Sequence, residues 1–214
     1  MENKTSESQL RERKKAAIRS KVLEVAQKLF HQSGFDGTTI DQICNEALIS
    51  KRTFFRYFKD KESLVFPHRE EKLEAFILFL ENHRDAQNPF DSLRVATRVF
   101  GSEYAKNKDS LRTQQTLILN SLSLVARERE IDQDWQKAIA DALSARAGQV
   151  PGSDLWAQVL AGAIMGVVRS TMNFWFAQNC EIDLTSLGLD ALECLEKGFP
   201  QTVTPQSREL SSPG

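Results

Sequence analysis

The sequence predicts an all-α protein of about nine helices, with an N-terminal three-helix helix-turn-helix domain followed by a larger C-terminal helical bundle. Apolar residues recur at helical spacing in almost every segment, and no segment alternates apolar and polar residues as a half-buried strand does. Capping residues such as Ser50 and Asn88 precede these segments, and glycines such as Gly34 and Gly148 follow them. The three patterns agree on helical structure throughout the chain.

The N-terminal domain is predicted to contain three helices within residues 16–66. An apolar stripe that begins at Ile18 predicts a first helix ending at Gly34. Thr38 is expected to cap a short second helix, and Asp41 to return the capping hydrogen bond. Ser50 is expected to cap a third helix that runs to Phe58, and Asp60 to cap a fourth that begins at Lys61. Residues 1–15 are polar and basic and are expected to form a mobile arm.

Longer helices are predicted across residues 67–199. Asn88 and Pro89 mark one start, and Asp109 marks another. One or two helices are expected between residues 123 and 146, a long one over about 153–180, and a last one over about 185–197. The Pro- and Ser-rich residues 200–214 are expected to be disordered.

The composition is typical of an ordinary globular protein, with 214 residues, 41% of them hydrophobic and 27% charged. No apolar stretch follows basic residues at the N-terminus, so we expect a cytoplasmic protein without a signal peptide. The three cysteines and three histidines have no metal-ligand spacing, and no nucleophile with its base, paired carboxylates or phosphate loop is evident. We therefore expect no metal, no cofactor and no catalytic residues.

Charge is distributed unevenly along the chain. Residues 1–61 hold 13 Lys and Arg against 8 Asp and Glu, a net charge of +5, whereas the whole chain has a net charge of −1. On a helical projection of the third helix, Phe54, Phe55 and Phe58 share one face. The opposite face carries two arginines with Thr53 and Tyr57, which suits a DNA major groove, although a merely solvated amphipathic helix remains the alternative.

Residues 16–66, above all "LFHQSGFDGTTIDQICNEALISKRTFFRYFKDKESLV", resemble the DNA-binding domain of the TetR family of bacterial transcriptional regulators. The shared features are a first helix ending in Phe, a Gly-aromatic pair, two threonines, a Ser-capped third helix, "TFFRYF" and a lysine that opens the fourth helix. The "RTFFRYF" form is also similar to a subgroup that includes mycofactocin-type regulators. The resemblance implies a homodimeric, ligand-responsive regulator, usually a repressor, that binds an inverted-repeat DNA operator.

The resemblance also implies a role for each matching residue. Thr39 and Lys61 would bind phosphates, Tyr57 would clamp the DNA backbone, and Phe55 would touch a thymine methyl or pack internally. Phe55 stands where the family often has Tyr, and Leu48 stands where it usually has Gly. A left-handed backbone at Leu48 would cost about 1–2 kcal/mol. The residues that would face bases or nearby phosphates are Lys51, Arg52, Thr53 and Arg56.

The segment from Leu155 to Cys180 contains a single charged residue, Arg169, and so predicts a helix buried on most sides. A membrane span is disfavoured, because polar residues interrupt the segment and basic anchors are missing. A homodimer interface in the last two helices, as the resemblance implies, and core packing within a monomer are the alternatives. The residues expected at the interface are Trp156, Val159, Gly162, Ala163, Gly166 and Leu192.

Residues 62–214, which hold 15 Lys and Arg against 21 Asp and Glu, are also rich in aromatic residues. These aromatics could line a pocket for a small apolar or amphipathic effector or simply form the core. A helical enzyme and a protein-interaction module remain as other classes, and an activator of the same fold remains within the leading one. The operator, the effector and the regulated genes are not specified by the sequence. The expected pocket residues are Phe100, Tyr104, Trp135, Phe174 and Trp175.

Overall fold

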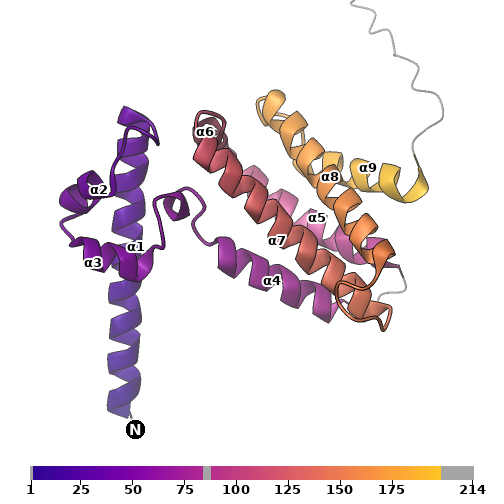
Figure 1. Ribbon diagram of the computed structural model, residues 1–214, viewed down its shortest axis with the longest axis horizontal. Coiled ribbons are helices and arrows are strands. Elements are labelled where there is room, and N and C mark those ends of the chain that lie inside the picture. Colours follow the sequence, from indigo (N-terminus) through magenta and orange to yellow (C-terminus); the bar gives the residue numbers. More distant parts are fainter. Residues whose placement is uncertain (1, 84–87, 199–214) are drawn as a thin grey trace, which may run out of the picture. The chain divides into compact units, whose positions relative to one another are not determined.

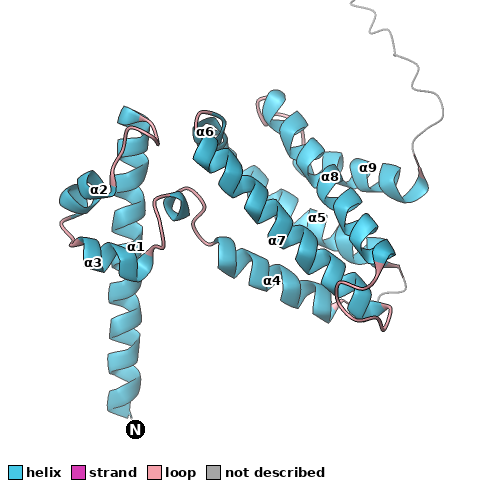
Figure 2. Cartoon of the chain, in the orientation of Figure 1, coloured by secondary structure: helices cyan, strands magenta, loops and turns pink. Residues whose placement is uncertain are grey.

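The computed structural model describes residues 2–83 and 88–198, and within them every regular element is helical (Figures 1 and 2). This part of the chain contains nine α-helices and one short 3₁₀ helix. The predicted all-α fold is confirmed, whereas the predicted disordered tail lies outside the described residues. The chain divides into two compact units, Met1–Leu78 with Asn107–Trp135, and Phe79–Lys106 with Gln136–Gly214.

The first unit contains the predicted helix-turn-helix. Its helices are α1 (Glu2–Ser33), α2 (Ile40–Ala47), α3 (Lys51–Tyr57), the 3₁₀ helix η1 (Glu62–Leu64), most of α4 (Arg69–Asn82), α6 (Lys108–Leu119) and the first half of α7 (Leu122–Arg146).

The first helix is longer than the sequence pattern indicated. α1 begins at Glu2, so it includes the residues expected to form a separate arm. The physical reason is that residues 2–15 contain no Gly or Pro and are rich in Glu, Lys, Arg and Gln, which are good helix formers. The N-terminal turns of α1 extend beyond α2 and α3 (Figure 1). Whether they move stays a prediction.

One apolar core holds the first unit together. Val22 and Phe30 from α1 meet Ile43 from α2 and Phe54 from α3, all with almost no exposed surface. Two residues beyond the predicted domain, Ile118 of α6 and Leu124 of α7, belong to the same core, as do Val65 and the 3₁₀ helix residue Leu64. α3 is therefore fixed by a core larger than the three-helix domain itself.

The fourth helix does not begin where the sequence analysis placed it. The chain forms only the single 3₁₀ turn η1 after Lys61, and α4 begins at Arg69. Pro67 separates the two, and proline disfavours a helical backbone in the residue before it. Lys61, not Asp60, is the N-cap residue of this turn, although the Asp60 carboxylate accepts a hydrogen bond from the Ser63 amide at 2.8 Å.

The second unit is built around α5 (Pro89–Lys106), α8 (Leu155–Ala177) and α9 (Leu184–Lys197), with α9 packed against both of the others. Glycines allow α5 and α9 to approach closely. A methyl group added at Gly101 would lie 3.1 Å from the Cα of Thr185, and one at Gly188 would lie 2.8 Å from the Thr97 methyl. These two glycines therefore serve the packing inside the protomer.

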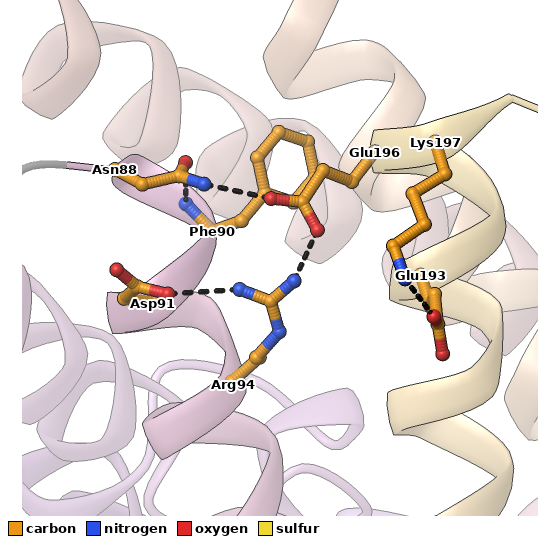
Figure 3. Close-up of polar contacts among 7 residues, drawn as sticks. All are labelled: Asn88, Phe90, Asp91, Arg94, Glu193, Glu196 and Lys197. Atoms are coloured by element: carbon orange, nitrogen blue, oxygen red, sulfur yellow. Dashed lines mark hydrogen bonds and ion pairs between the residues drawn. The ribbon is translucent and has the colours of Figure 1, made fainter.

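Polar contacts join the start of α5 to the end of α9 (Figure 3). The Glu196 carboxylate accepts a hydrogen bond from the side-chain amide of Asn88 at 2.7 Å and pairs with the Arg94 guanidinium. Arg94 also pairs with Asp91 at 2.9 Å, and the Asn88 side-chain oxygen caps α5 by accepting from the Phe90 amide. The predicted cap at Asn88 is thus present, and it is also part of the contact between the two helices.

α8 exposes an unusual amount of apolar surface. It runs from Leu155 to Ala177, a few residues shorter at each end than predicted, and Asp154 caps it. By length and composition it could cross a membrane, and only 22% of its apolar window is buried. The exposed fraction of Trp156 is 78% and that of Val159 is 54%, so one side of this helix faces away from the protomer core.

Candidate nucleic-acid interface

α3 is a short, capped helix anchored by two aromatic residues. The Ser50 side chain accepts a hydrogen bond from the Thr53 amide at 3.1 Å, which confirms the predicted cap. Phe54 is fully buried and Phe58 is 4% exposed, and their ring centroids are 5.5 Å apart. Because a seven-residue helix is too short to persist alone, these buried rings are what hold it in place.

On the face of α3 opposite the phenyl rings, Arg52 and Arg56 are exposed, as the helical projection predicted, while Thr53 and Tyr57 are half-buried. Lys51, which the projection places on the side of the phenyl rings, is exposed as well. Phe55 differs from the projection, because 53% of its surface is exposed. Its ring still meets the buried Phe54 ring edge to face, with centroids 5.3 Å apart, so Phe55 lies at the edge of the exposed face.

The cap of α2 is one residue later than the sequence analysis placed it. Thr39, not Thr38, caps the helix, and Gln42, not Asp41, returns the hydrogen bond to the Thr39 amide at 2.8 Å. Thr38 is instead buried, and its hydroxyl donates to the carbonyl of Gly34 at 2.8 Å. The hydroxyl of Thr39, a predicted phosphate ligand, therefore already takes part in the capping box.

The turn between α2 and α3 has the left-handed backbone that the family pattern implies. Leu48 has φ 57° and ψ 45°, and 83% of its surface is exposed. Its amide donates to the carbonyl of Asn45 at 3.2 Å and so ends α2. The turn thus keeps its geometry without the usual glycine, at a cost of about 1–2 kcal/mol.

Lys51 and Asp41 form an ion pair across the two short helices, with 2.7 Å between Nζ and Oδ1. This ion pair was not predicted, because Asp41 was expected to belong to the cap of α2. Both residues lie in the first turn of their helices, a pattern that could have indicated the pair. Burial raises the pKa of the nearby Cys44 thiol; the Asp41 carboxylate raises it further, and the Lys51 ammonium lowers it.

Arg56 and Tyr57 contact each other. The guanidinium of Arg56 lies 4.8 Å from the centre of the Tyr57 ring and donates a hydrogen bond to the Tyr57 hydroxyl oxygen at 3.0 Å. The tyrosine hydroxyl still has its own proton to donate. The two side chains are therefore held in a fixed arrangement at the C-terminal end of α3, where each keeps donors for an acceptor outside the protein.

Lys61 contacts the protein more closely than the resemblance implied. Its ammonium donates to the carbonyls of Phe35 and Thr38, each at 2.8 Å, and lies 4.2 Å from the centre of the Phe35 ring. It does not stand at the start of α4. Lys61 holds the turn between α1 and α2, which leaves one of its three N–H groups for another acceptor.

Most of the predicted interface residues of α8 face outward. Trp156, Val159 and Gly166 are exposed, and Gly162 and Ala163 are half-buried. Leu192 of α9 is only 4% exposed because it packs inside the protomer, so it does not belong to this outward surface.

The five predicted pocket aromatics lie in different surroundings, and their role in a pocket stays a prediction. Trp175 is 1% exposed and donates its indole N–H to the Ile182 carbonyl at 2.9 Å, whereas Phe174 is 48% exposed. Trp135 packs on Phe76 in the first unit, with ring centroids 4.8 Å apart. Phe100 and Tyr104 are half-buried on α5, and burial raises the pKa of the Tyr104 hydroxyl. Trp175 is therefore a core residue.

A small apolar hollow of about 30 Å³ lies in the second unit instead. Aliphatic side chains from α4, α5, α7 and α8 line it, together with Arg146 and with His83, whose Nδ1 lies 2.8 Å from the Phe79 carbonyl oxygen. A space of this size holds about one water molecule. None of the five aromatics lines this hollow. Its aliphatic lining residues resemble ordinary core residues, so no sequence motif predicted them. They include Leu80, Leu93, Ile139, Leu143 and Ile164.

The part of the chain that the structure describes contains no group of His, Cys, Asp and Glu that could hold a metal ion.

Two family models match the chain. Residues 22–66 match the model described as bacterial regulatory proteins of the tetR family, and residues 87–200 match the model described as the MftR C-terminal domain. A Mycobacterium tuberculosis protein named as the mycofactocin biosynthesis transcriptional regulator MftR is 25% identical over 84% of this chain and 95% of its own length. The transcriptional regulator TcmR of Streptomyces glaucescens is 25% identical over 90% of this chain and 87% of its own.

Solved structures share the fold at lower identity. The repressor FadR of Thermus thermophilus in complex with lauroyl-CoA aligns with a TM-score of 0.59 and 24% identity, over 92% of this chain and 99% of that one. FadR of Bacillus subtilis in complex with stearoyl-CoA aligns with a TM-score of 0.58 and 21% identity, over 85% and 99%.

Proposed function

Because the chain belongs to the TetR family of bacterial transcriptional regulators, we propose that it is a cytoplasmic homodimeric repressor that binds an inverted-repeat operator and is released by a small effector. Family membership makes it a transcriptional regulator and not an enzyme. The observation that carries the proposal is the exposed face of α3, where Lys51, Arg52 and Arg56 stand on a helix fixed by buried rings.

Base reading is assigned to the arginines of α3. An arginine that forks onto a guanine contributes about 1–3 kcal/mol of discrimination against the wrong base. Arg52 lies in the first turn of α3, and Arg56 is held against Tyr57 near its end. The two guanidiniums therefore occupy separate places along the helix, which suits contacts to different base pairs.

The test is binding to the DNA that flanks the protein's own gene, followed by fluorescence anisotropy with Arg52→Ala and Arg56→Ala. We expect at least one variant to lose about 1–3 kcal/mol on that DNA and to relax the preference at one position in each half-site. Arg98→Ala is the matched control, because it removes an exposed arginine from α5 in the other unit. If both α3 variants keep the wild-type sequence preference, direct reading by α3 is wrong.

Dimerisation is assigned to the outward face of α8. One recognition helix buries little surface, so two copies related by a two-fold axis are expected to bind an inverted repeat. The exposed Trp156, Val159 and Gly166 provide an apolar surface for the second copy. A membrane partner for the same apolar surface would show as vesicle binding by the purified protein, which we do not expect.

The effector is assigned to the hollow in the second unit. FadR of Bacillus subtilis and FadR of Thermus thermophilus were solved with acyl-CoA ligands. The hollow here has an apolar lining with Arg146 and His83 beside it, which suits an amphipathic molecule with an anionic group. Its volume of about 30 Å³ means that helices must move apart for such a molecule to enter.

Blocking the hollow tests this assignment with lauroyl-CoA as the probe. Ala142→Leu should narrow the space and weaken any release of DNA by lauroyl-CoA, while leaving DNA affinity unchanged. Ala145→Leu, at an exposed site on the same helix, is the control. If lauroyl-CoA releases both variants alike, its site is elsewhere; if it releases not even the wild type, acyl-CoA is not the effector class.

A further inference from the structure

The Asp41–Lys51 ion pair has a geometry that bears on how α3 meets DNA. Asp41 lies in the first turn of α2, where the helix dipole favours a carboxylate. Lys51 is the first residue of α3, where the dipole disfavours an ammonium. The carboxylate 2.7 Å away offsets that unfavourable placement and fixes the direction of the Lys51 side chain.

The pair contributes little to folding. The Asp41 side chain is 60% exposed and that of Lys51 is 59% exposed. Exposed ion pairs of this kind are screened by water and salt and have small effects on stability. Asp41 lies beside α3, so its carboxylate can affect DNA binding more than it affects stability.

We infer that Asp41 is a specificity-determining residue that withholds Lys51 from a phosphate contact which random DNA would otherwise gain. The inference rests on the proposed binding of DNA by α3. On random DNA, a phosphate must compete with the Asp41 carboxylate for the Lys51 ammonium, and the carboxylate itself repels the phosphate. On the operator, contacts from Arg52 and Arg56 fix the position of α3, so a Lys51–phosphate contact adds less affinity there than on random DNA. Asp41 thus weakens non-specific binding more than specific binding.

A second ion pair on the same helix provides a matched control. Glu46 of α2 pairs with Lys28 of α1 at 3.0 Å, with side-chain exposures of 51% and 58%. Its geometry and exposure are close to those of the Asp41–Lys51 pair, but its partner belongs to α1 and not to α3. Glu46→Gln and Asp41→Asn each remove one negative charge from α2, so they change the net charge of the protein equally.

The experiment measures the affinity of the full-length protein for a random-sequence duplex over a range of salt concentrations. Asp41→Asn should tighten this binding about three- to tenfold at low salt and steepen the slope of log affinity against log salt by about 0.9, the value for one more phosphate contact. Affinity for a duplex selected by the wild type should rise less, so the specificity ratio falls. Asp41→Glu, which can still reach Lys51, should restore wild-type behaviour.

Variants of Lys51 and Glu46 show whether Asp41 acts through the Lys51 ammonium. In a Lys51→Gln background, Asp41→Asn should no longer change the salt slope, because the phosphate contact requires the ammonium. If it still does, or if Asp41→Asn behaves like Glu46→Gln, the inference is overturned. If the wild type selects no duplex at all, the proposed function fails instead, so the two failures are distinguishable.

Discussion

α3 and α8 each leave one face exposed, but the chemistry of the two faces is opposite. α3 exposes the charged Arg52 and Arg56, whereas α8 exposes the apolar Trp156 and Val159. Exposed charged side chains are well hydrated in water, and positive ones can bind a polyanion. A broad apolar face is unfavourable in water until another apolar surface covers it. The exposed face of each helix, and not its buried face, therefore indicates the partner.

The largest effect on stability is expected at the buried phenyl rings that fix α3. Phe54→Ala removes a fully buried ring and should lower the free energy of unfolding by about 3–5 kcal/mol, with loss of DNA binding. Thermal denaturation followed by circular dichroism measures the first effect. Phe55→Ala, at a neighbouring ring that is 53% exposed, should change stability by less than about 0.5 kcal/mol. Equal losses in the two variants would contradict the division of α3 into two faces.

The apolar face of α8 is tested by Gly166→Leu. A side chain here meets nothing within 4 Å inside the protomer, whereas one at Gly162 would approach Gln136 at 3.4 Å, so Gly166 is the cleaner position. We expect a shift to monomer in sedimentation and an operator affinity about 100-fold weaker, or about 2.8 kcal/mol, with helical content unchanged. Ala145→Leu, on an exposed site of α7, is the control. A variant that stays dimeric would remove Gly166 from the interface.

Lys61→Met separates folding from phosphate binding. The ammonium bonds to Phe35 and Thr38 are lost while the aliphatic chain stays, so stability should fall by about 2 kcal/mol. Thermal denaturation checks this, with the exposed Lys59→Met as the control. Unchanged stability would refute the structural role. A salt slope of DNA binding that is flatter by about 0.9 would show that Lys61 also binds a phosphate.

The smallest expected effect is a gain in stability. Leu48→Gly relieves the left-handed backbone of the turn but adds freedom to the unfolded chain, so unfolding should require about 0.5–1 kcal/mol more. Chemical denaturation measures this difference. DNA affinity should stay unchanged, because the turn geometry is already present. A destabilised variant would mean that the exposed Leu48 side chain makes contacts that matter.

Capping residues and amphipathic spacing predicted those features of the helices that depend only on residues close in sequence. The Ser50 and Asn88 caps and the amphipathic spacing of α3 are short-range features, and the structure has them. The cap of α2 was misplaced because two adjacent threonines compete for it, and burial of Thr38 decides the outcome. That burial depends on tertiary packing, which a local pattern does not contain.

The parts that the sequence did not predict depend on distant residues. Phe55 was expected among the buried rings, but only Phe54 and Phe58 are buried, while Phe55 packs on Phe54 with half of its surface exposed. The hollow is formed by four helices whose aliphatic residues carry no motif. The Asp41–Lys51 pair joins residues that lie in the first turns of two different helices. Each of these features requires knowledge of which helices meet.

Selection of duplexes from a random pool by the purified protein, followed by sequencing, tests whether α3 reads DNA in a dimer. We expect an enriched inverted repeat whose two halves are related by the two-fold axis of the dimer, with one position in each half lost when Arg52 or Arg56 is replaced by Ala. Enrichment of a single unrepeated motif would contradict the dimeric arrangement. Enrichment of no motif at all would contradict reading of DNA by α3.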